Sequence, residues 1–158
     1  MIVHDIMVDV IIIFASTGGN TELVCATVAE ILEGRGISTI VQRVERSQVD
    51  DVDKGKIILL AAPTYEHGVI EYNFQPFLKE LAKKDLKGKP FAAIGLGDTK
   101  YDDHYHIESA NVLTQALKKA KGSTLVHALR INKSPLPQLE TVVREWTLHL
   151  AKKITESI

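Results

Sequence analysis

The sequence has one cysteine, almost no excess of charge of either sign and no long apolar run. Cys25 alone cannot form a disulfide framework, which fits a reducing compartment. A net charge of −1 gives no reason to expect nucleic acid or an anionic membrane surface as a partner. The apolar run 8–14 is far too short to cross a bilayer, and residues 2–7 lack the charged start and cleavage site of a signal peptide. We therefore expect a soluble, cytoplasmic protein.

Repeats, low-complexity tracts and inter-domain linkers are also missing from the sequence. With 158 residues, 45% of them hydrophobic, the chain is long and apolar enough to bury one substantial core. We expect a single domain over residues 1–158, with residues 1–7 as an N-terminal extension.

Apolar segments and helical patterns alternate along the chain. Strands are expected at 8–14, 37–44, 57–62, 91–96 and 124–131, and helices at 21–33, 71–84, 107–121 and 139–154, with a single helical turn at 48–54. Strand 37–44 mixes apolar and polar residues, which suits an edge. Segment 134–137 is interpreted as only a strand-to-helix connection. The alternation predicts an α/β fold, a three-layer, doubly wound sandwich with a five-stranded parallel sheet.

The connection between strand 8–14 and helix 21–33 is rich in hydroxyls, glycines and amides: Ser16, Thr17, Gly18, Gly19, Asn20 and Thr21. Glycines let backbone N–H groups turn inward, and the helix that follows points its unsatisfied donors at an anion. The loop contains no lysine or arginine, which suits a phosphate monoester on a bound cofactor better than a triphosphate with Mg²⁺. The alternative is a helix cap with a flexible turn.

Two further loops at the carboxyl ends of predicted strands each carry a tyrosine. One holds Pro63, Thr64, Tyr65, Glu66 and His67, and the other runs from Leu96 through Gly97, Asp98 and Tyr101 to His104. Ligands of such sheets bind outside these strand ends, where the winding reverses. A phosphate loop between two tyrosine loops indicates a clamp for a phosphorylated flat ring, because aromatic faces stack on planar π-systems. Taken singly, each tyrosine is equally well an ordinary core or surface residue.

These three segments together resemble the short-chain flavodoxins, and the similarity covers the chain from about residue 8 to its end. Segment 16–22 matches the phosphate loop of that family, 63–65 its first flavin loop and 95–101 its second. The family is itself a standard example of binding at the switch point, so the strand order 2-1-3-4-5 is taken from the resemblance. Segment 124–131 shows no inserted loop of the kind found in long-chain members.

The resemblance implies an FMN-binding electron carrier that passes single electrons between redox enzymes. It implies that Tyr65 covers the inner face of the flavin and Tyr101 the outer face. The implied FMN contacts are Ser16, Thr17, Gly18, Gly19, Asn20, Thr21, Pro63, Thr64, Tyr65, Glu66, His67, Leu96, Gly97, Asp98, Tyr101 and His104. We expect a monomer that forms transient complexes with a reductase and an electron acceptor, and no metal site.

The sequence departs from the family pattern in four places. Glu66 and His67 stand where the first flavin loop often has glycine, so either the loop turns less easily or the turn has shifted toward Gly68. Gly18 replaces a frequent threonine, and the near-neutral charge replaces a strongly acidic one. His104 follows the second tyrosine where apolar residues are usual. A histidine beside the ring would couple the flavin potential to pH between roughly 5 and 8.

Two other functions fit the same fold. An FMN-dependent NAD(P)H or quinone reductase would need an open flavin face, which two covering tyrosines disfavour. A flavin-free regulatory module of the response-regulator kind would need an acidic cluster after the first strand and an aspartate after the third. The sequence has Ala15-Ser16 and Pro63-Thr64 at those positions.

Overall fold

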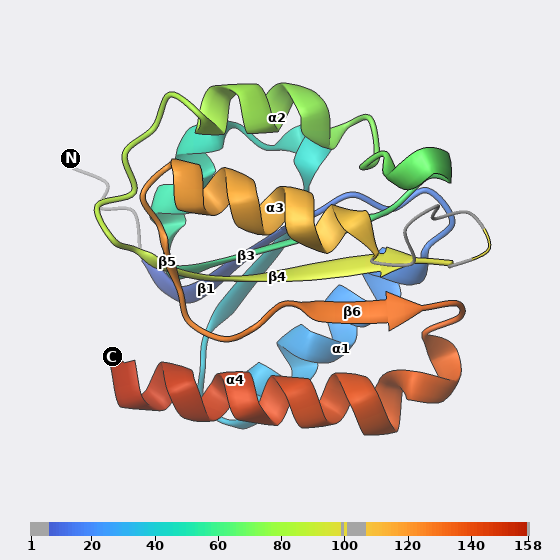
Figure 1. Ribbon diagram of the computed structural model, residues 1–158. Helices are drawn as coiled ribbons and strands as arrows, with labels where there is room; N and C mark the ends of the chain where they lie inside the picture. Colours follow the sequence, from blue (N-terminus) through green and yellow to red (C-terminus); the bar gives the residue numbers. More distant parts are fainter. Residues whose placement is uncertain (1–6, 99, 101–106, 158) are drawn as a thin grey trace.

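A parallel sheet lies at the centre of the molecule, with helices on both faces (Figure 1). The computed structural model describes residues 7–98, 100 and 107–157. The strand order is β2-β1-β3-β4-β5, and a further strand, β6, also pairs with β4. The strands are β1 (Val8–Phe14), β2 (Thr39–Arg43), β3 (Gly55–Pro63), β4 (Pro90–Gly97), β5 (Ser123–Thr124) and β6 (Leu129–Asn132). The predicted fold class and the order 2-1-3-4-5 are confirmed, with one strand more than expected.

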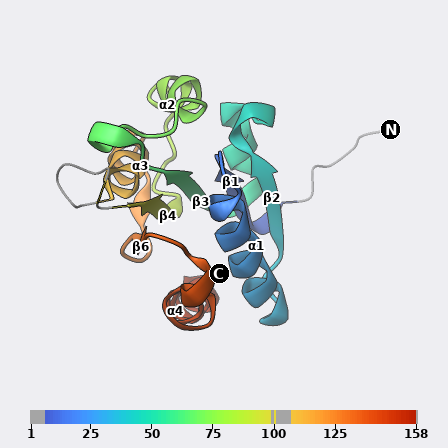
Figure 2. The same ribbon diagram turned by 90° about the vertical axis from the view of Figure 1, so that its right-hand side faces the viewer.

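Helices α1 (Asn20–Gly34) and α4 (Arg144–Ser157) cover one face of the sheet, and α2 (Phe74–Leu81) and α3 (Glu108–Lys119) cover the other (Figure 2). Successive residues of β1 point to opposite faces, so Ile12 packs in the α1–α4 layer and Ile11 and Ile13 in the α2–α3 layer. Both layers are buried, which explains why the central strands are almost continuously apolar.

The extra strand results from a break in the predicted strand 124–131. Phe91 of β4 pairs with Thr124 of β5, and Ile94 of β4 pairs with Leu129 of β6. Between these two pairs β4 advances three residues, whereas the chain that forms β5 and β6 advances five. The two additional residues bulge out of the ladder. The indole N–H of Trp146 on α4 donates a hydrogen bond of 2.9 Å to the carbonyl of His127 inside this bulge. A carbonyl that has left the sheet thus finds a partner in the core.

Other boundaries differ from expectation by short distances. Segment 48–54 forms a 3-10 helix over Val49–Lys54, close to the predicted turn. Helix α2 is shorter than the predicted 71–84, with Pro76 in its first turn, where a missing N–H costs little. The last helix begins with a π-helical stretch, Leu139–Val143, before α4. In the described residues, no helix combines the length and apolarity needed to cross a membrane.

Helix α3 lies unusually close to β4 at Gly95. A Cβ atom at this position would lie 2.5 Å from the backbone nitrogen of Ala110 and 2.8 Å from Oγ of Ser109. Only glycine allows this approach without movement of the helix. The start of α3 is therefore held directly over the carboxyl end of the sheet.

Candidate functional site

The loops that follow β1, β3, β4 and β6 enclose one pocket of about 400 Å³. This volume is in the range of small-molecule and cofactor sites. The pocket is lined by Ser16, Thr17, Gly18, Asn20, Thr21, Pro63, Thr64, Tyr65, Leu96, Gly97, Asp98, Lys133 and Ser134. The structure thus brings most of the sequence-predicted residues together in one place.

Three of the predicted residues that the structure describes lie outside this lining. Gly19 belongs to the first loop without lining the pocket, and Glu66 and His67 line an adjoining hollow with Tyr65 and the exposed Tyr72. Tyr101 and His104 lie outside the described residues, so their roles stay predictions.

The first loop is shaped by its own serine. Oγ of Ser16 accepts hydrogen bonds from the backbone N–H groups of Gly19, at 3.1 Å, and Glu22, at 3.4 Å. Gly19 has φ +89°, a left-handed conformation that glycine adopts at little cost. The alternative of a helix cap is therefore partly realised. The N–H groups of Asn20 and Thr21, in the first turn of α1, have no acceptor within the helix and are available to an anion.

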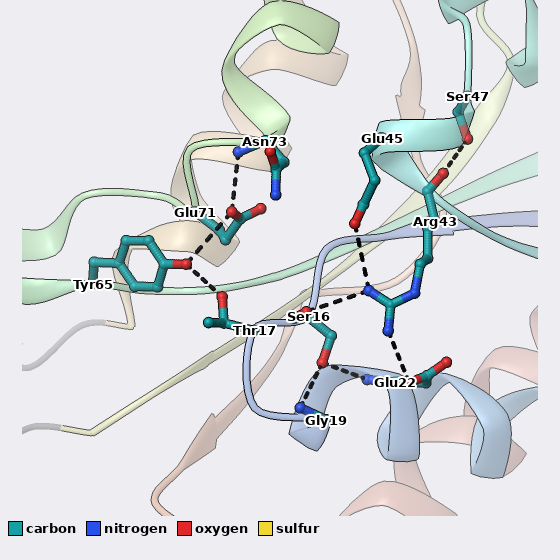
Figure 3. A network of polar contacts seen from close by, with 10 residues as sticks. All are labelled: Ser16, Thr17, Gly19, Glu22, Arg43, Glu45, Ser47, Tyr65, Glu71 and Asn73. Atoms are coloured by element: carbon teal, nitrogen blue, oxygen red, sulfur yellow. Dashed lines mark hydrogen bonds and ion pairs between the residues drawn. The ribbon is translucent and has the colours of Figure 1, made fainter.

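Tyr65 connects the first loop to a buried carboxylate (Figure 3). Its hydroxyl oxygen lies 2.5 Å from Oγ1 of Thr17 and donates to Oε1 of Glu71 at 3.4 Å. The same carboxylate oxygen accepts the N–H of Asn73 at 3.1 Å. Oε2 of Glu71 is buried and has no hydrogen-bond partner in the structure as described. Sequence reasoning missed Glu71, which lies in the predicted helix 71–84 but ahead of the start of α2.

The turn after Tyr65 has two successive residues with positive φ. His67 has φ +62° and Gly68 has φ +74°, whereas Glu66 does not have a positive φ. The N–H of Gly68 donates to the carbonyl of Tyr65 at 3.2 Å. His67 is thus the third residue of this turn, the position that has a positive φ in type II turns, and Gly68 is the fourth. His67 rather than Gly68 thus occupies the position that needs a positive φ, and a left-handed conformation is strained for a residue other than glycine.

A hydrogen-bonded network ties the loop after β3 to α3. Oγ1 of Thr64 donates to Oγ of Ser109 at 2.8 Å and accepts the N–H of Ser109 at 3.0 Å. Oγ of Ser109 donates in turn to the carbonyl of Ala62 at 2.8 Å. All of these groups are buried, so the network fixes the floor of the pocket.

Replacement of Ser109 by alanine is expected to lower the free energy of unfolding by about 1–3 kcal/mol, because buried partners lose their hydrogen bonds. Urea denaturation would measure the change. Ser157→Ala, which removes an exposed hydroxyl bonded at 2.8 Å to the carbonyl of Lys153, should change the value by less than about 0.5 kcal/mol. Equal effects of the two substitutions would contradict the assigned role of the network.

The pocket contains two residues that the sequence did not indicate. Lys133 and Ser134 follow β6, and Ser134 begins segment 134–137, interpreted from the sequence as a plain connection. The N–H of Lys133 donates to the carbonyl of Gly97 at 2.7 Å, and Lys133 has φ +68°. The sequence could have indicated these two residues through their position directly after the last strand of the sheet, where ligands of such folds bind. Asp98 lines the pocket as predicted, and its carboxylate caps the following turn through the N–H of Lys100 at 2.9 Å.

A cation also stands behind the first loop, although the loop sequence has none. Arg43, the last residue of β2, donates from Nη2 to Glu22 at 3.0 Å and from Nη1 to the carbonyl of Ser16 at 3.4 Å (Figure 3). Nη1 also lies 3.5 Å from Oε2 of Glu45. The guanidinium is 5.3 Å from the centre of the Phe14 ring.

Other reactive groups are not gathered into a site. Residues 7–98, 100 and 107–157 contain no cluster of three or more histidine, cysteine or acidic side chains placed to hold a metal. Burial, and to a lesser extent the charge of Glu22, raises the pKa of the Cys25 thiol well above its ordinary value. Cys25 is therefore a packing residue of the α1–α4 layer, not a nucleophile.

Known proteins resemble this chain in sequence and in fold. The Flavodoxin family profile matches residues 12–146. A flavodoxin of Maridesulfovibrio salexigens is 30% identical over 91% of this chain and 97% of its own length. Protein MioC of Escherichia coli strain K12 is 30% identical over 89% of this chain and 94% of its own. Oxidised flavodoxin 2 from Bacillus cereus has the same fold, with a TM-score of 0.84 and 22% identity over 95% of this chain and 99% of that one.

The family profile spans the four loops of the pocket and most of the sheet. The strand order agrees with this assignment, and so do the uncharged loop at the start of α1 and the tyrosine after β3. The chain belongs to the flavodoxin family of FMN-binding electron-transfer proteins.

Proposed function

We propose that FMN occupies the pocket with its phosphate on loop 16–21 and its ring between the loops that follow β3 and β4. Bound FMN accepts and releases electrons one at a time. The observation that carries the proposal is the meeting of an uncharged donor loop at the start of α1 with Tyr65 in one pocket.

The donors of loop 16–21 fit a phosphate group. The hydroxyl of Thr17 and the N–H groups at the start of α1 are neutral hydrogen-bond partners for phosphate oxygens. A Cβ on Gly18 would have no heavy atom within 4 Å, so there is open space beside this residue for an anion. Ser16 shapes the loop through its two hydrogen bonds and contributes mainly by position.

The part of the pocket lined by the loops after β3 and β4 fits a flat ring. Tyr65 lies on one side of it, and Thr64 and Gly97 approach each other so closely that a Cβ on Gly97 would lie 3.3 Å from Cβ of Thr64. Lys133 adds a positive charge on the side of β6, and Asp98 adds a negative one. By the family resemblance, Tyr101 and His104 complete the outer face, and a flavin contact for Glu66 and His67 is proposed on the same basis.

Titration of the apoprotein tests this assignment. We expect FMN to bind at least about 100-fold more tightly than riboflavin, because only FMN offers a phosphate to the loop. Quenching of flavin fluorescence measures both dissociation constants. Equal affinities would remove the proposed role of loop 16–21.

Redox partners are proposed to dock beside Tyr65–Gly68, where Tyr72 is 63% exposed. Aromatic side chains of this kind are common anchors of interfaces, and transient redox complexes use small ones. The partners remain a reductase and an electron acceptor by class, and the protein is proposed to act as a monomer. Sedimentation at micromolar concentration tests the oligomeric state.

Electron transfer to a partner is expected to depend weakly on ionic strength, because the chain carries a net charge of only −1. Between low and high salt, we expect the second-order rate constant to change by less than about threefold. Stopped-flow mixing of the reduced protein with an acceptor gives this constant. A steep fall with salt would show that local charge dominates docking.

Flavodoxins are electron carriers and not enzymes, which disfavours both the reductase and the flavin-free module. NADPH oxidation by the purified protein alone should accordingly be slow. The cytoplasm stays our expectation for its location, and Cys25 as the single cysteine is consistent with a reducing compartment.

A further inference from the structure

Glu22 places a negative charge beside the loop assigned to the phosphate. It lies in the first turn of α1, and its own N–H contacts Ser16 at 3.4 Å, so its backbone is part of the loop. When no ligand is present, the negative charge of an acidic residue in this turn interacts favourably with the helix dipole. The same charge repels a phosphate dianion that approaches the donors of that turn.

Arg43 counters this charge from the neighbouring strand. Its guanidinium reaches Glu22 at 3.0 Å and the carbonyl of Ser16 at 3.4 Å (Figure 3). The same group lies over the ring of Phe14. The Arg43 side chain is only 30% exposed, whereas that of Glu22 is 53% exposed. The planar fork of arginine suits this bridging position, because one group contacts both partners.

Glu45 occupies the far side of the same guanidinium, with 3.5 Å between Oε2 and Nη1. The cluster of Arg43, Glu22 and Glu45 therefore carries no positive excess. With two carboxylates on one guanidinium, the cluster offers the phosphate no direct attraction, and the contacts of Arg43 with Glu22 and with the carbonyl of Ser16 are the ones that bear on the loop.

We propose that Arg43 is a positioning residue for the flavin phosphate, which it serves by neutralising Glu22 and fixing Ser16 without touching the ligand. The inference rests on the proposed function of loop 16–21 as the phosphate site. The expected effect depends on the phosphate: loss of Arg43 weakens the binding of FMN and leaves the binding of riboflavin, which has no phosphate, nearly unchanged.

Three variants and two ligands test the proposal. Arg43→Gln is expected to raise the dissociation constant of FMN about tenfold, by exposing the dianion to the charge of Glu22, and that of riboflavin less than about twofold. Adding Glu22→Gln should restore FMN affinity to within about threefold of the wild type, because the repelling charge is gone. Arg46→Gln is the matched control, since it removes the same charge three residues further on from an exposed side chain.

The possible outcomes distinguish a failure of the phosphate assignment from a failure of the role of Arg43. Wild-type protein that binds FMN no better than riboflavin would overturn the phosphate assignment itself. With that preference intact, equal losses for FMN and riboflavin in Arg43→Gln, or no rescue by Glu22→Gln, would overturn the role of Arg43. An equal effect of Arg46→Gln would also overturn it, because a general loss of surface charge would then suffice. Unfolding curves of each variant establish that the fold is retained.

Discussion

Replacing Gly18 by aspartate is expected to weaken FMN binding by about 100-fold, because a carboxylate a few ångströms from a phosphate dianion repels it strongly. The fold should tolerate the change. A Cβ at Gly18 has no heavy atom within 4 Å, and its backbone does not have the positive φ that Gly19 has. Fluorescence titration gives the affinity, and urea denaturation gives the stability.

Gly18→Asn is the matched control, since asparagine has nearly the shape of aspartate without its charge. We expect it to weaken FMN binding by less than about tenfold, through crowding of the loop alone. Riboflavin affinity should be similar in both variants. If aspartate and asparagine reduced FMN affinity equally, charge would not be the cause and the phosphate would lie elsewhere.

Replacing Gly95 by alanine is expected to lower the free energy of unfolding by about 3 kcal/mol, near the upper end of overpacking effects. The new methyl group would lie 2.5 Å from the backbone nitrogen of Ala110 and 2.7 Å from its Cβ. Helix α3 must move away from β4 to accommodate it. That movement also strains the hydrogen bonds that the N–H and the hydroxyl of Ser109 donate to Thr64 and Ala62.

Gly34→Ala provides the comparison for this substitution. Gly34 ends α1, has an ordinary φ, and a Cβ there would contact no heavy atom within 4 Å. Alanine should be neutral or stabilise the helix by up to about 1 kcal/mol. Denaturant midpoints and slopes of both variants give the free energies. A loss below about 1 kcal/mol for Gly95→Ala would mean that the contact between α3 and β4 is easily relaxed.

The fold was predictable where local pattern and burial agree. The run 8–14 was predicted with the bounds that β1 has, because a strand buried on both faces leaves a nearly continuous apolar signature, interrupted here by Asp9 near its start. The last strand was not predictable in the same way. Val126, Leu129 and Ile131 are all buried, and a bulge does not change which residues are apolar. Its position depends on pairing with β4 and on the indole of Trp146, which is distant in sequence.

The residues of the site also differ in whether the sequence alone predicts them. Loop 16–21 and Tyr65 were predictable because a short segment carries both their chemistry and their place at a strand end. Arg43 and Lys133 were not, because each reaches the pocket or its loop through the packing of elements that are far apart in the sequence. Glu71 is only six residues from Tyr65, but it lay inside the predicted helix 71–84, and nothing in that pattern indicates a contact with the tyrosine hydroxyl. An arginine at the end of an edge strand looks like a solvated charge until the neighbouring strand is placed.

Trp146 is the only tryptophan of the chain, and it is nearly buried, with its N–H bonded to the bulge before β6. The molecule therefore carries its single indole fluorophore where its C-terminal helix contacts the segment before its last strand. Undocking of α4 would expose the indole to water and shift its emission to longer wavelength. Tryptophan fluorescence can thus show, without any label, whether the contact between α4 and the bulge is lost before or after the rest of the sheet unfolds.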